Sequence, residues 1–130
     1  MGFDQAVADR TLTELGQQII ADPRYNGQER DWQGIAVVVQ VAPRERLFGY
    51  IYRPDGSWTA GMPDLDATIE KAIELSQAMR IEGKEVWKTC LIQIQRPGPK
   101  LKVDFEYDNP DRWAVTPANL RQKVEELRPR

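Results

Sequence analysis

Residues Ile35–Tyr52, IAVVVQVAPRERLFGYIY, predict the centre of a β-sheet, because two apolar segments flank one short polar connection. Ile35–Val41 is rich in β-branched residues and predicts a buried strand. Ala42–Glu45 makes the connection, so Leu47–Tyr52 is expected to return beside it as the second strand of a hairpin. A Pro-Asp-Gly turn follows and predicts a third, shorter strand over Ser57–Gly61. The first half of the sheet is therefore a three-stranded meander.

A second hairpin is predicted nearer the end of the sequence. Val86–Gln95 alternates between apolar and polar residues with period two, which is typical of a strand. Arg96–Pro99 has the composition of a turn, and Leu101–Asp108 alternates again. These segments predict the fourth and fifth strands.

Three helices are expected around these strands. Asp4–Ala21 and Leu65–Glu82 repeat apolar residues at three- and four-residue spacing, and Gly83 suits the end of the second helix. Thr116 and Pro117 are typical of a helix start, with the Thr116 hydroxyl as the cap. The sequence therefore predicts three helices that alternate with two groups of strands.

This order, α-β-β-β-α-β-β-α, predicts one α+β domain over residues 1–130 with a largely antiparallel five-stranded sheet and helices packed on one face. The edge at which the second hairpin joins the first stays open, because the intervening helix permits either. A chain of 130 residues with 41% hydrophobic content and a net charge of -2 suits one core of ordinary size.

Composition also bears on location. The longest apolar run, Ile35–Val39, is far shorter than the roughly 20 residues that cross a bilayer, so no membrane segment is expected. The first ten residues, MGFDQAVADR, do not have the basic start and apolar centre of a secretory signal. Cys90 is the only cysteine, which rules out a disulfide within one chain. We expect a cytoplasmic protein.

Catalysis is not expected. The chain has no histidine, the residue that general acid-base chemistry near neutral pH uses most. Cys90 lies on the apolar side of its predicted strand, which favours a buried core residue over a thiolate nucleophile. We therefore predict a protein that is not an enzyme and needs no cofactor.

The acidic residues of the fifth strand raise the question of a metal site. Asp104, Glu106 and Asp108 would share one strand face, where carboxylates could hold a hard cation such as Ca²⁺ or Mg²⁺. A solvated, charged sheet face explains the same alternation. Lysines that could pair with the acids across the sheet, Lys88, Lys100 and Lys102, favour this second interpretation. No metal site is predicted.

An aromatic strand suggests an alternative, nucleic-acid function. Residues 46–52, RLFGYIY, resemble the aromatic strand of RNA-recognition motifs, with Phe48, Tyr50 and Tyr52 on one face. Leu47 and Arg53 depart from that motif, and a pI of 5.2 opposes phosphate binding. Ordinary packing of the rings is favoured, while a single-stranded RNA-binding module stays as an alternative.

Four short motifs follow one another along the chain: FGYIY at 48–52 with the following Asp-Gly turn and Trp58, Trp87-Lys88, DFEYDNPDRW at 104–113, and TPANL at 116–120. Taken in this order, they resemble the YezG-like family of small bacterial immunity or antitoxin proteins. The resemblance spans about Leu12 to Pro129. It implies a cytoplasmic protein that binds and neutralises a toxin domain, often a nuclease, encoded beside it.

The residues predicted to contact such a partner come from the physical chemistry of the chain. A nuclease presents Lys and Arg to phosphate, so an inhibitor gains from carboxylates and from aromatic anchors between them. The alternative that the two aromatic rings only lock the last helix onto the sheet stays open, as does a small adaptor domain with no toxin partner. The predicted residues are Asp104, Glu106, Asp108, Asp111, Tyr107 and Trp113.

Overall fold

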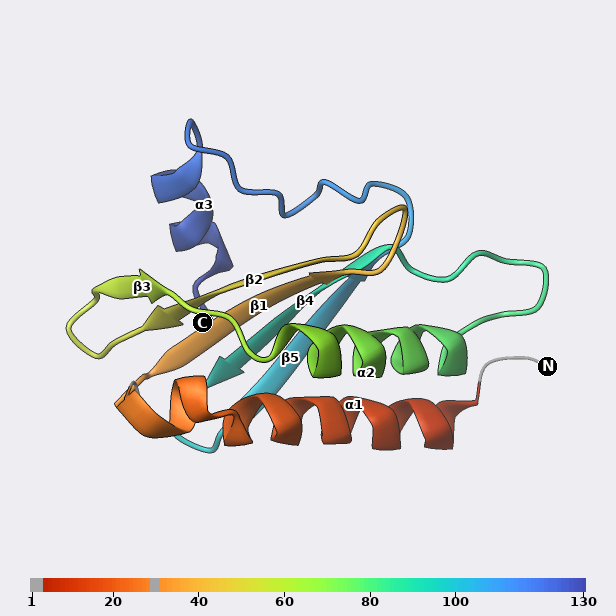
Figure 1. Cartoon of the computed structure of the whole chain (residues 1–130), viewed down its shortest axis with the longest axis horizontal. Coiled ribbons are helices and arrows are strands. Elements are labelled where there is room, and N and C mark those ends of the chain that lie inside the picture. Colours follow the sequence, from red (N-terminus) through yellow and green to blue (C-terminus); the bar gives the residue numbers. More distant parts are fainter. Residues whose placement is uncertain (1–3, 29–30) are drawn as a thin grey trace.

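The computed structural model of the protein describes residues 4–28 and 31–130 (Figure 1). Every described strand belongs to one sheet. The elements are α1 Gln5–Ala21, the short π-helical turn η1 Arg24–Gln28, β1 Gly34–Gln40, β2 Arg46–Tyr52, β3 Trp58–Ala60, α2 Leu65–Ala78, β4 Thr89–Gln95, β5 Lys100–Glu106 and α3 Leu120–Leu127.

The sheet confirms the predicted α+β class and element order. Its strands lie in the order β3-β2-β1-β4-β5, and every neighbouring pair is antiparallel. The second hairpin thus joins the first through β4 and β1, so β1 lies in the centre. Val38 of β1, for example, lies opposite Phe48 on one side and Leu91 on the other.

The main core lies between the sheet and the two longer helices. Ile35, Val37 and Val39 point toward α1 and α2, where they join Leu15 and Leu75. Figure 1 shows α1 and α2 side by side on this face of the sheet. The apolar side chains that recur about every 3.6 residues along both helices and at every second residue along the strands are buried together in this layer.

The prediction that all helices pack on one face is wrong for α3, which covers the opposite face (Figure 1). The reason lies in β1, which is buried at every position and therefore needs apolar cover on both sides. Ala36 and Val38 supply the second face, on which Val124 and Leu127 of α3 pack. The Tyr52 hydroxyl donates a hydrogen bond to the Val124 carbonyl at 2.6 Å and ties α3 to β2.

Three element boundaries differ from the prediction by three residues or more. The helix expected to start at Thr116 begins at Leu120, because Thr116 and Asn119 form a separate turn. In that turn the Asn119 side chain accepts a hydrogen bond from the Thr116 amide at 2.7 Å, and the Thr116 hydroxyl accepts one from the Asn119 amide at 3.3 Å. In addition, α2 ends at Ala78 and β4 begins at Thr89.

Candidate protein-binding surface

The segment after β5 is organised by the carboxylate of Glu106. It accepts hydrogen bonds from the backbone amides of Asp108 at 2.9 Å and Asn109 at 3.1 Å, and from the Arg112 guanidinium at 3.2 Å. The amides of Asn109 and Asp108, followed by Arg112, lower the pKa of Glu106 below its ordinary value. Glu106 therefore shapes the loop, and its charge is already partly neutralised.

Asp108 and Asp111 are the exposed acids of this loop. Their backbone amides are held, by Glu106 and by the Asn109 side chain respectively. Within the part of the chain that the structure describes, their carboxylates accept no hydrogen bond and form no ion pair. The loop thus fixes their positions and leaves both charges available to a partner.

Tyr107 lies beside a pocket that the sequence did not reveal. Its side chain is 43% exposed, and Ile81 across the pocket is 52% exposed. The pocket has a volume of about 360 Å³, and its lining combines apolar side chains with charged ones. Its lining residues are Met79, Ile81, Gly83, Lys84, Glu85, Tyr107 and Asp108. The sequence predicts Ile81 within the second helix, but α2 ends at Ala78 and leaves Ile81 on the surface.

Trp113, the other predicted anchor, belongs to the fold. It is 8% exposed and packs with Val38 and Val124 in the second core, which lies between the sheet and α3. The Arg112 guanidinium lies 4.8 Å from its ring centre, consistent with a cation-π contact. The sequence leaves two roles open for this ring, an anchor for a partner or a residue that holds the last helix on the sheet. Its packing favours the second role.

The six predicted residues do not form one continuous group. Asp104 lies opposite Leu91 and Glu106 opposite Thr89, so both project from the α3 side of β5. Tyr107, Asp108 and Asp111 lie beyond the end of that strand. Beyond that strand, the exposed predicted residues without a side-chain partner among the described residues are Tyr107, Asp108 and Asp111. Together with the pocket beside Tyr107, we call them the Tyr107 surface.

The lysines expected to pair with the β5 acids do not do so. Lys88 pairs with Glu85 at 3.1 Å. Lys100 and Lys102 lie on β5 itself, next to the acids along the strand. Among the described residues, no group of three His, Cys, Asp or Glu side chains could hold a metal ion.

The aromatic strand is packed and offers no open stacking platform. Phe48, Tyr50 and Tyr52 share one face as predicted, but Tyr50 and Tyr52 are buried in the second core. The Tyr50 ring meets the Trp58 ring edge-on at 5.6 Å, and the Arg128 guanidinium lies 4.7 Å from the Tyr52 ring centre. Base stacking needs exposed ring faces, which this arrangement removes.

We expect no measurable binding of single-stranded oligonucleotides at physiological salt. A stacking platform would contribute about 1–3 kcal/mol per base, and the buried rings cannot supply it. Fluorescence anisotropy with labelled RNA and DNA oligonucleotides checks this result. Salt-sensitive micromolar binding that is lost in Phe48→Ala, with the fold intact, would contradict it.

Cys90 is a core residue. It is fully buried opposite Val39, and this burial raises the pKa of its thiol far above the ordinary value. A thiol that stays protonated at neutral pH is a poor nucleophile. Cys90 therefore contributes packing.

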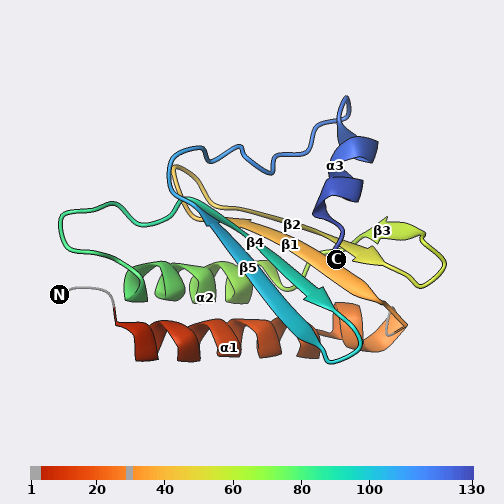
Figure 2. The same ribbon diagram turned by 180° about the vertical axis from the view of Figure 1, so that it is seen from behind.

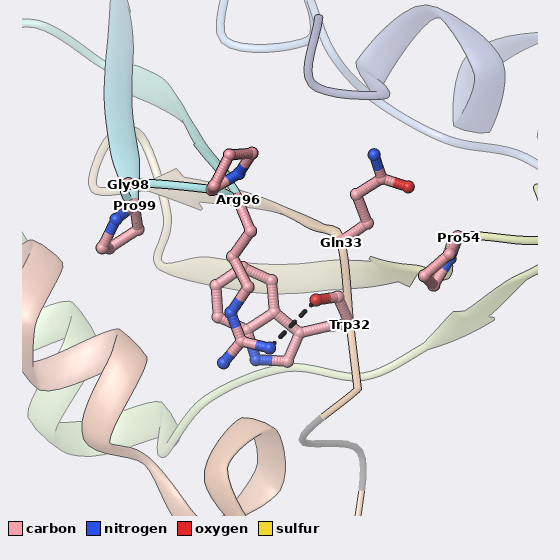
Figure 3. Close-up of a pocket in the computed structure, with 7 residues that line it drawn as sticks. Trp32, Gln33, Pro54, Arg96, Gly98 and Pro99 are labelled. Atoms are coloured by element: carbon pink, nitrogen blue, oxygen red, sulfur yellow. Dashed lines mark hydrogen bonds between the residues drawn. The ribbon is translucent and has the colours of Figure 1, made fainter.

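A second pocket, of about 540 Å³, lies at the other end of the sheet (Figure 3). The Arg96 guanidinium stacks on the Trp32 ring at 3.7 Å from its centre and donates a hydrogen bond to the Trp32 carbonyl at 3.1 Å. Prolines 54, 97 and 99 line the rest together with Gln33 and Gly98. Its described lining contains no carboxylate, thiol or imidazole. The sequence indicated only a turn here, because the β1-β4 register is what brings Arg96 to Trp32.

Comparison with models of known protein families gives no match for this chain, and comparison with curated proteins gives no relative. The resemblance to YezG-like immunity proteins therefore stays a prediction. Separately, no helix within residues 4–28 and 31–130 has the length and apolar character of a membrane span.

Proposed function

We propose that this protein is a non-catalytic immunity protein that binds and neutralises a toxin domain through a stoichiometric protein-protein contact. The observation that carries the proposal is the Tyr107 surface, where the exposed Tyr107 ring and Asp108 line one pocket and the exposed Asp111 follows in the same loop. The identity of the partner as a toxin rests on the resemblance of the sequence motifs to YezG-like proteins.

The chemistry of the surface suits a basic partner. Asp108 and Asp111 attract Lys and Arg side chains of the kind that a nuclease presents to phosphate. Tyrosine at the centre of an interface, surrounded by groups that exclude water, is a common binding hot spot. Tyr107 suits such a role, because its exposed ring lines a pocket into which a partner side chain can insert.

Titration of the protein with the toxin domain encoded by the adjoining gene tests the proposal. We expect Tyr107→Ala to weaken affinity by about 2 kcal/mol, or roughly 30-fold, because a hot-spot ring is lost. Asp108→Lys combined with Asp111→Lys is expected to slow association and to remove much of its salt dependence. Isothermal titration and stopped-flow kinetics measure the two effects.

A matched control reverses two exposed acids elsewhere, Asp66→Lys with Glu70→Lys, in the first half of α2. This variant should keep the parental affinity. If the toxin binds but neither Tyr107→Ala nor the Asp108/Asp111 reversal alters its affinity, the partner uses another surface. If the purified toxin does not bind at all, the immunity proposal fails.

A further inference from the structure

The outer edge of β5 is long and open. β5 is the last strand of the sheet and has seven residues, whereas β3 at the opposite edge has three. Figure 2 shows β5 at the margin of the sheet, beside β4 alone. In the described part of the chain, no segment pairs with its outer backbone groups. A strand of this length with an open edge is a template for pairing with another strand.

The register identifies the backbone groups that face outward. The Val41 amide donates a hydrogen bond to the Lys88 carbonyl at 2.8 Å, and the Arg96 amide donates one to the Gln33 carbonyl at 2.9 Å. Between Lys88 and Arg96, every second residue of β4 therefore directs its backbone amide and carbonyl toward β1. The backbone amides and carbonyls of the intervening residues, including Leu91 and Gln93, therefore point toward β5. Asp104 and Lys102, which lie opposite them, direct their own backbone groups inward toward β4. Consequently, Leu101, Val103 and Phe105 direct their amide and carbonyl groups to the open edge.

The side chains of β5 have a charge pattern that is complementary to itself. On the α3 side of the sheet, the strand carries Lys100 and Lys102 in its first half and Asp104 and Glu106 in its second half. Lys100, Lys102 and Asp104 form no ion pair within the described residues. When a second copy of the strand lies antiparallel beside the first, each positive side chain faces a negative one.

We propose that two copies of this chain associate by antiparallel pairing of their β5 strands about a two-fold axis at Val103. Val103 would then exchange backbone hydrogen bonds with the partner's Val103, and Leu101 with the partner's Phe105. Lys102 would face the partner's Asp104 at a position without backbone hydrogen bonds, where facing side chains lie closest. The two sheets become one continuous sheet across the dimer.

The charges select this register. A slip of two residues in one direction places Asp104 opposite the partner's Asp104, and a slip in the other places Lys102 opposite the partner's Lys102. Parallel pairing in register places every charge opposite its like. Like charges directly opposite destabilise a strand pair, so only the register centred on Val103 pairs all four charges favourably.

The other face of β5 supports the same arrangement. Leu101, Val103 and Phe105 lie on the α1 side, and Leu101 is 40% exposed. In the proposed dimer, Leu101 lies beside the partner's Phe105 and its exposed surface is covered. Glu106 takes a smaller part, because its own loop already engages its carboxylate. The central pairs of Lys102 with the partner's Asp104 are therefore the ones to test.

The dimer does not depend on the proposed immunity function. Tyr107, Asp108 and Asp111 follow β5 in the chain and lie outside the paired segment. The dimer rests on the pairing of β5 alone, and the experiment below needs no toxin.

Sedimentation of the purified full chain over a concentration series tests the proposal. We expect a monomer-dimer equilibrium for the parental protein. Lys102→Asp and Asp104→Lys should each weaken self-association by about tenfold or more, since each variant places two like pairs across the axis. A mixture of the two variants should restore dimers, because each positive residue of one variant then faces a negative residue of the other. Arg44→Glu, an exposed reversal in the β1-β2 connection, should leave the equilibrium unchanged.

Circular dichroism of each variant verifies that the fold is retained. A parental protein that stays monomeric at the concentrations used for NMR spectroscopy would overturn the proposal. So would dimerisation that both reversals leave unchanged, or two monomeric variants that fail to associate when mixed. Dimer formation in the mixture of the two variants also excludes unfolding as the cause of their weaker self-association, because an unfolded variant could not form a dimer with the other.

Discussion

Trp113→Ala is expected to lower the free energy of unfolding by about 3–5 kcal/mol, the usual cost of truncating a buried tryptophan. Trp113 packs with Val38 on the sheet and Val124 on α3, so its loss leaves a cavity at the junction of the loop, the sheet and the helix. The cation-π contact with Arg112 is lost as well. Chemical denaturation monitored by circular dichroism measures the change.

Tyr107→Ala is the matched control for this prediction, because its ring lies in the same loop and is 43% exposed. We expect it to change stability by less than about 1 kcal/mol. Amide hydrogen exchange adds a local readout: Trp113→Ala should accelerate exchange in α3 more than in α1, since the lost contacts hold α3. Equal effects of the two substitutions on stability would contradict the assignment of Trp113 to the fold and Tyr107 to the surface.

Gly49→Ala is expected to destabilise the protein by about 3 kcal/mol, at the upper end of what overpacking of a core usually costs. Gly49 lies opposite Val37 in the middle of the sheet. A Cβ at this position would lie 2.7 Å from the Gly61 carbonyl oxygen and 3.0 Å from that of Ala36. Both contacts are with backbone, so a side-chain rotation cannot relieve them.

The same substitution at Gly27 is the control. A Cβ there meets nothing within 4 Å, so Gly27→Ala should change the free energy of unfolding by less than about 0.5 kcal/mol. Thermal and denaturant unfolding of the two variants gives the comparison. A stable Gly49→Ala protein would show that β2 can move away from the Gly61 segment, and would remove the packing reason for glycine at this position.

Local pattern predicted the strands and two helices well because each element is set mainly by its own residues. The β-branched run at Ile35–Val39 places β1 correctly, and the alternation over Val86–Gln95 predicts β4 and its end, although the strand begins only at Thr89. The end of α2 at Ala78 was missed, since the apolar period continues through Ile81 while the chain leaves the helix. The start of α3 was missed because Thr116 and Asn119 satisfy each other in a turn of their own.

The candidate site was less predictable than the fold. Six residues were expected together because they are close in the sequence, but alternation along β5 sends Asp104 and Glu106 to one face of the sheet. Burial separates Trp113 from Tyr107, although both are large aromatic residues of one loop. The pocket beside Tyr107 includes Met79 and Ile81, which follow the C-terminal end of α2 and carry no motif.

The α+β class, the order of helices and strands along the chain and the burial of Cys90 follow from the amino-acid sequence alone. Periodicity, turn composition and apolar character specify these features locally. The pairing of β4 with β1, the position of α3 on the second face and the open edge of β5 emerge only when the elements pack together. These features depend on which apolar faces pack against each other. In β1 both faces are apolar, so the central strand could be recognised as buried, but the elements that cover each of its faces are fixed only by long-range packing.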